Sequence, residues 1–251
     1  MAVAIDVVGS SVNFDSAVSV TTSSLITVGA SATLLLVGLT FNNFNNNSGS
    51  PSSPTGISVT WNGVTMTLIP NTSGAAGTWS SSSTGTQTYL YGLVNPASGA
   101  QSLNATWTNS VHGYIVAMSF TGSNIANVAA ACPNGTTNTG ASSATGSTTF
   151  SVTVTTNVGD FVAGVFAETA GDSWTGAGAN CSVWSDNTSG AGNNLGSDYS
   201  TASAAGSTFT LGAVIALAGG VSINWLISAT NITAPGAASQ FASGQSLLLF
   251  M

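Results

Sequence analysis

Acidic side chains are the main groups in this 251-residue chain that could do chemistry, and five of its seven carboxylates fall within one stretch. Loops that bring several carboxylate oxygens together can bind a hard cation such as Ca²⁺. The stretch lacks the Asp-x-Asp-x-Asp spacing of a calcium loop, so solvated loop charges remain the alternative interpretation. The candidate calcium ligands are Asp160, Glu168, Asp172, Asp186 and Asp198.

Residues for bond-breaking chemistry are scarce. Nucleophilic hydrolysis needs a base beside the nucleophile, but His112 is the only histidine and no Gly-x-Ser-x-Gly motif occurs. A glycosidase needs two carboxylates across a cleft, and the one close pair that includes the glutamate, Glu168 with Asp172, lies in a predicted turn. We therefore expect no catalytic residues, no cofactor and no enzyme.

Two tryptophans are candidates for binding sugars, because an aromatic face packs against the apolar face of a sugar ring. Trp79 and Trp174 are flanked by Gly, Ser and Thr, which predicts that they lie on loops. The other four tryptophans occur in strand-like runs, where core packing explains them.

The two cysteines, Cys132 and Cys181, allow at most one disulfide within the chain. Two unpaired thiols are the alternative, which synthesis in a reducing cytosol would favour. The sequence leaves both open.

The charge balance excludes whole classes of partner. The chain has no Lys and no Arg, and its formal net charge is −7. Nucleic acids and anionic membranes are bound through basic side chains, so neither is an expected partner. A weakly charged surface of hydroxyls and amides suits a subunit of a larger assembly.

Short runs of β-branched and aromatic residues, separated by Gly, Asn, Pro and Ser, predict an all-β protein built as an antiparallel β-sandwich. Helical periodicity is absent. The predicted strands are Ser24–Val28, Thr33–Phe41, Ile57–Trp61, Thr65–Ile69, Thr86–Leu93, Gln101–Trp107, Tyr114–Phe120, Phe150–Thr155, Asp160–Ala167, Cys181–Trp184, Ser207–Leu217, Val221–Ala229 and Ser246–Phe250.

Turn chemistry connects several of these runs. Asn62-Gly63 predicts a hairpin between the two runs that flank it, because both residues tolerate a positive φ. A second turn is predicted at Asn95–Gly99, and a further reversal of the chain near His112-Gly113.

The simplest domain organisation is a single large sandwich over residues 1–251. A two-part organisation is the alternative, with its boundary in the Ser-, Thr-, Asn- and Gly-rich connection 122–149.

Two apolar stretches bear on membranes and assembly. Leu211–Ala229 is uncharged, but the central Gly219-Gly220 and the lack of flanking basic residues favour a buried hairpin over a membrane span. The apolar run Leu247–Met251 would be costly to expose to water. It is expected to form a central strand or to insert into a neighbouring subunit.

Three segments carry a resemblance to known proteins: Val59–Thr67, Leu90–Gly99 and Ile115–Gly122. Together they resemble β-sandwich modules of phage structural proteins and bacterial surface proteins. The resemblance implies a jelly-roll-like sandwich used for display or attachment, and it carries no catalytic residues.

These features predict a virion structural protein, such as a phage capsid decoration, head-fibre or tail-associated subunit. Its expected partners are copies of itself and other virion or shell proteins, with a host-surface glycan as a further candidate. The amino-terminal residues contain no basic region and no continuous apolar stretch, so no secretory signal peptide is expected and the location is the virion surface. The alternative is a cell-surface or extracellular filament subunit with a carbohydrate-binding face.

Overall fold

The computed structural model describes residues 2–42, 52–80, 83–142, 146–168, 173–177, 181–187, 195–200, 204–217 and 223–236. In these ranges the chain forms strands in antiparallel pairs and one short helix, α1 (Val128–Ala131). The all-β, antiparallel class predicted from the sequence is therefore confirmed.

The first half of the chain builds an eight-stranded sheet and a separate two-stranded ribbon, β2 (Thr27–Val28) with β9 (Gly99–Ala100). The eight strands are β1 (Ala4–Thr22), β3 (Leu34–Asn42), β4 (Ser58–Trp61), β5 (Val64–Thr65), β6 (Thr67–Leu68), β7 (Gly74–Ser80), β8 (Ser83–Val94) and β10 (Leu103–Thr121). Their order is β5-β4-β10-β3-β8-β6, with β1 paired to β10 and β7 paired to β8.

This sheet bends over on itself, because its two longest strands, β1 and β10, turn a corner together. Ser16 in β1 and Asn109 in β10 have positive φ, and the register between the two strands shifts around Ala17. Such bulges bend a paired strand sharply. Both halves of β10 then contribute to one apolar cluster, which includes Trp107 from the first half and Ile115 from the second.

Two predictions about turns had opposite outcomes. The hairpin at Asn62-Gly63 is confirmed: Trp61 pairs with Val64 across a two-residue turn in which both residues have positive φ. The reversal predicted near His112-Gly113 is wrong, because β10 continues through these residues as one strand. Gly113 is needed there for close packing, since a Cβ would overlap the ring of Phe14.

The second half of the chain builds two further sheets. The five-stranded sheet has the order β11-β18-β13-β16-β15, and the three-stranded sheet has the order β12-β17-β14. Their strands are β11 (Thr136–Ser142), β12 (Gly146–Thr155), β13 (Phe161–Glu168), β14 (Ser173–Ala177), β15 (Cys181–Asn187), β16 (Leu195–Ser200), β17 (Thr208–Leu217) and β18 (Ile223–Ile232).

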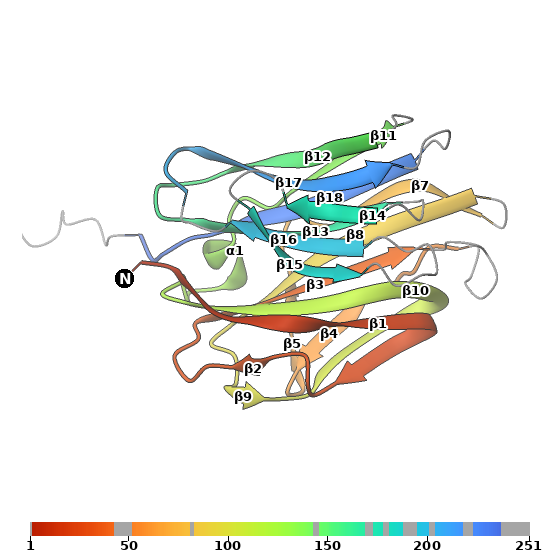
Figure 1. Ribbon diagram of the computed structural model, residues 1–251. Helices are drawn as coiled ribbons and strands as arrows, with labels where there is room; N and C mark the ends of the chain where they lie inside the picture. Colours follow the sequence, from red (N-terminus) through yellow and green to blue (C-terminus); the bar gives the residue numbers. More distant parts are fainter. Residues whose placement is uncertain are drawn as a thin grey trace, which may run out of the picture.

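The five-stranded sheet packs between the other two, with β12 and β17 above it and β1 and β10 below it in Figure 1. One apolar cluster joins it to the eight-stranded sheet, and a second joins it to the three-stranded sheet. Every residue of β3 is buried, because one face of this strand meets the five-stranded sheet and the other faces the bent half of its own sheet. Gly38 in β3 allows the closest approach, since a Cβ there would overlap Val165 of β13.

The predicted hairpin over Leu211–Ala229 is wrong, because β17 and β18 belong to different sheets. Within the described residues, no helix is long and apolar enough to cross a membrane. The connection 122–149 marks the change from the eight-stranded sheet to the other two, but it also contains β11, which the sequence did not predict. The apolar run Leu247–Met251 lies outside the described residues.

Candidate functional site

The structure separates two of the candidate calcium ligands, Asp160 and Glu168. Asp160 comes directly before β13 and Glu168 is its last residue, so eight residue steps of extended chain place them roughly 26 Å apart. Asp186 and Asp198 lie on β15 and β16, and Asp172 lies outside the described residues. Among the side chains that the structure describes, which leave out those of Asp186 and Asp198, no three His, Cys, Asp or Glu residues meet as a metal site.

Asp160 closes a tight turn that leads into β13. Its Oδ2 accepts a hydrogen bond of 2.8 Å from the backbone N–H of Asn157, and its own N–H donates to the carbonyl of Asn157 over 3.1 Å. Gly159 has a φ of +97°, which a residue with a side chain rarely adopts. The chain therefore presents the Asp160 carboxylate from a rigid loop.

A buried asparagine holds the same carboxylate from the neighbouring strand. Nδ2 of Asn231 in β18 donates to Oδ2 of Asp160 over 2.7 Å, and Oδ1 of Asn231 accepts from the N–H of Asn134 over 3.0 Å. Asp160 is 2% exposed and Asn231 is fully buried. Both donors to the carboxylate are neutral, so its charge is stabilised by hydrogen bonds alone.

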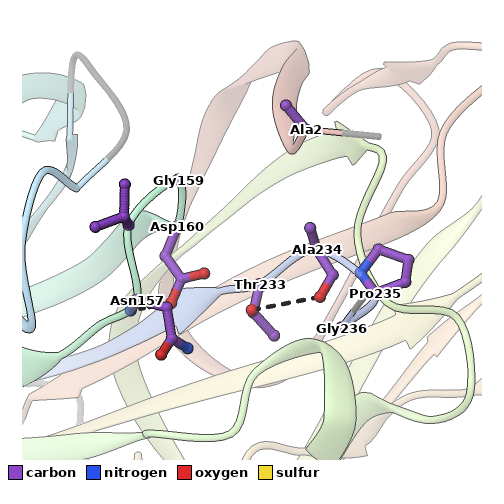
Figure 2. Close-up of a pocket in the computed structure, with 9 residues that line it drawn as sticks. Ala2, Asn157, Gly159, Asp160, Thr233, Ala234, Pro235 and Gly236 are labelled. Carbon is purple, nitrogen blue, oxygen red and sulfur yellow. Dashed lines mark hydrogen bonds between the residues drawn. The ribbon is translucent and has the colours of Figure 1, made fainter. Parts of the chain in front are cut away.

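The Asp160 carboxylate lies at a cavity of about 460 Å³. Its walls come from the loop 157–160, the segment 233–236 that follows β18, and Ala2. Figure 2 shows the carboxylate between these two stretches, with one oxygen turned toward Asn157 and the other away from it. The structure gives this second oxygen, Oδ1, no hydrogen bond to any of the described residues.

Known proteins give no match to this chain, whether family models, curated proteins or solved structures are compared. The interpretation of the cavity therefore depends on its own contacts.

The lining residues support binding and do not support bond cleavage. The cavity holds one carboxylate, and no second acid or histidine lies among its lining residues. Val158, Ala234 and Pro235 add apolar surface beside the carboxylate. Such a site can accept hydrogen bonds from a ligand and cover an apolar part of it.

His112 is built into the fold away from the cavity. Its Nδ1 lies 2.5 Å from a carboxylate oxygen of Asp15, and this contact connects β10 to β1 beside the ring of Phe14. His112 is largely buried, whereas Asp15 is 74% exposed. The pair fastens the two bent strands together.

The two cysteines are not joined to each other, so the predicted option of a disulfide is not realised. Cys132 is buried in the cluster between the eight- and five-stranded sheets, whereas Cys181 packs against the cluster on the other face of the five-stranded sheet. Burial raises the pKa of Cys132 to about 12, although a hydrogen bond with Thr230 opposes that shift.

Trp79 and Trp174 lie on strands, β7 and β14, and not on the predicted loops. Their side chains are outside the described part of the structure, so the sugar contact stays a prediction. Of the residues that shape the cavity, the sequence singled out only Asp160, as a candidate calcium ligand. The others were missed, although Asn157-Val158-Gly159 is turn-forming sequence just before a predicted strand.

Proposed function

We propose that this chain is a virion structural protein, a phage capsid decoration, head-fibre or tail-associated subunit that acts by self-assembly and attachment. In this proposal the sheets form a jelly-roll-like β-sandwich, as in the phage and bacterial surface modules that the sequence resembles. The observation that carries the proposal is the outer edge of β1 around the exposed Val18.

β1 is 19 residues long, and β10 is its only strand partner among the described residues. Near its amino-terminal end the backbone N–H of Ser10 donates to the carbonyl of Leu25, so the edge relevant to assembly is the part near Val18. Val8 and Val18 on this strand are exposed. Natural sheets block long edges with charged side chains, above all lysine, because an open edge pairs with other strands. This chain contains no lysine.

The two acids of β1 are both engaged within the chain. Asp6 accepts hydrogen bonds from the N–H of Gly29 over 2.9 Å and from the hydroxyl of Ser119 over 2.7 Å. Asp15 contacts His112. The edge therefore suits addition of a strand from a second copy, and two such edges can pair about a twofold axis.

Light scattering of the purified full chain, with electron microscopy of the same sample, tests this proposal. We expect oligomers that co-sediment with virus particles, and we expect Val18→Lys to shift them to monomers without changing the circular dichroism spectrum. Ile125→Lys is the matched control, because Ile125 is equally exposed, at 50% against 51% for Val18, but lies outside the strands. A wild-type chain that stays monomeric and never co-sediments with particles would refute the proposal.

A further inference from the structure

Neither this chain nor a second copy of it can offer a Lys or Arg side chain to the Asp160 carboxylate. The chain contains no Lys and no Arg, and its one histidine is engaged by Asp15. A second copy brings the same composition, so self-assembly supplies no basic side chain either. Because burying an unpaired charge is costly, this carboxylate favours an external cation.

One oxygen of the carboxylate is already satisfied and the other is free to bind. Oδ2 receives the hydrogen bonds from Asn157 and Asn231, which fix the orientation of the side chain. Oδ1 makes no hydrogen bond within the described residues, and Asp160 is one of the residues that line the cavity. An ionised carboxylate oxygen accepts further hydrogen bonds, and those from charged donors are the strongest.

The cavity walls combine apolar surface with one buried carboxylate, and a long basic side chain can contact both. Val158, which is 78% exposed, and Pro235 stand at the cavity with Ala234 and Ala2, while Asp160 is almost fully buried. Figure 2 shows the carboxylate flanked by the loop 157–160 and by Thr233–Gly236. Lys and Arg side chains bury an aliphatic stem on apolar surface and carry the charge at the tip.

We infer that this cavity is a docking site for a single Arg or Lys side chain of a different protein, with Oδ1 of Asp160 accepting its hydrogen bonds. The net charge of −7 attracts a basic partner to the chain as a whole. The partner's place in a shell or on a host surface rests on the proposed function, but the contact itself does not.

Nuclear magnetic resonance of the ¹⁵N-labelled full chain tests this inference with N-acetyl-arginine methylamide as the probe. We expect saturable shifts of the amide signals of Asn157, Gly159, Asp160 and Gly236, with a midpoint on the order of 1 mM for one side chain. The uncharged isostere N-acetyl-citrulline methylamide should bind at least about tenfold more weakly, because it lacks the cation.

Two variants with the same change in charge sharpen the test. Asp160→Asn keeps an oxygen for Asn157 and Asn231 but removes the carboxylate, and it should weaken binding of the arginine probe at least about tenfold. Asp15→Asn removes an exposed carboxylate outside the cavity and should leave binding unchanged.

Three results would overturn the inference: equal binding of the two probes to the wild-type chain, unchanged binding to Asp160→Asn, or saturation of the same amides by CaCl₂ while the arginine probe has no effect. The last result would identify a hydrated cation as the occupant. The comparison of the two probes needs no variant, so it stands even if Asp160→Asn fails to fold. Failure here leaves the assembly proposal intact, because light scattering tests that proposal separately.

Discussion

Strand β13 carries an acid at each end, and the two ends differ sharply. Asp160 and Glu168 are 2% and 1% exposed, so both carboxylates are buried in a chain without Lys or Arg. Asp160 receives two hydrogen bonds from neutral donors and meets a cavity. Glu168 lies opposite Trp225 in the sheet, and none of the described cavity walls reaches it.

The interface between the eight- and five-stranded sheets also changes along its length, from apolar to polar side chains. Leu34 and Leu36 of β3 lie in its apolar cluster, whereas Thr40, farther along the same face, is buried next to Thr88 of β8. The hydroxyls of Thr88 and Ser228 lie 2.5 Å apart and connect the two sheets. Asp160 thus differs from Glu168 in lining a cavity, while buried polar groups such as Thr88 and Ser228 fix how the sheets pack.

The largest effect is expected at the cavity end. Asp160→Ala removes the acceptor for Asn157 and Asn231 and leaves the fully buried Nδ2 of Asn231 without its partner. We expect the free energy of unfolding to fall by about 2–4 kcal/mol. Urea denaturation followed by tryptophan fluorescence measures this change.

The control for that loss is Asp160→Asn, which retains an acceptor oxygen and should cost about 1 kcal/mol or less. Equal losses for Asp160→Ala and Asp160→Asn would show that the charge, and not the hydrogen bonds, stabilises the loop 157–160.

The Thr88–Ser228 contact tests the opposite, polar end of the interface. Thr88→Val keeps the shape but leaves the buried hydroxyl of Ser228 unpaired, so it should cost about 1–2 kcal/mol. Adding Ser228→Ala should recover part of the loss, because removing both partners is milder than removing one. If the two single substitutions prove additive, the contact does not couple the sheets.

Replacing Glu168 is expected to stabilise the fold, whereas replacing Asp160 should destabilise it. Its carboxylate is buried in a chain that supplies no Lys or Arg, so Glu168→Gln should raise the free energy of unfolding at neutral pH by about 1 kcal/mol. Urea denaturation of the variant checks this increase. A clear loss of stability would mean that the charge is compensated in the fold, and the contrast with Asp160 would disappear.

The sequence predicts the regular parts of this fold well and its long-range features poorly. A nearly continuous apolar run located β3, and Asn62-Gly63 located a hairpin, because both signals are local. The corner in β1 and β10 depends on pairing between residues nearly a hundred positions apart, such as Ala17 with Val111. A glycine such as Gly113 therefore looks like a turn until the strand beside it is known.

The candidate site, too, is predicted by the sequence only where its residues give a local signal. Asp160 is noticeable in the sequence because acids are rare. Its partner Asn231 is 71 positions away and is one of many asparagines, so nothing in the local pattern selects it. The cavity also needs Ala2 and Thr233, which only the packing of β18 and the amino-terminal segment brings together.

The smallest expected effect is the reactivity of the Cys132 thiol, which lies next to a wall of the cavity in the chain. Thr233 of that wall donates its N–H to the carbonyl of Ala131, the residue before Cys132. Because burial raises the pKa of Cys132 to about 12, only about one thiol in ten thousand is ionised at pH 8. Iodoacetamide at pH 8, followed by mass spectrometry, should therefore leave Cys132 unmodified while the less buried Cys181 reacts. Labelling of both cysteines at similar rates in the folded chain would show that the cavity wall opens readily, and the rigid site inferred around Asp160 would then be wrong.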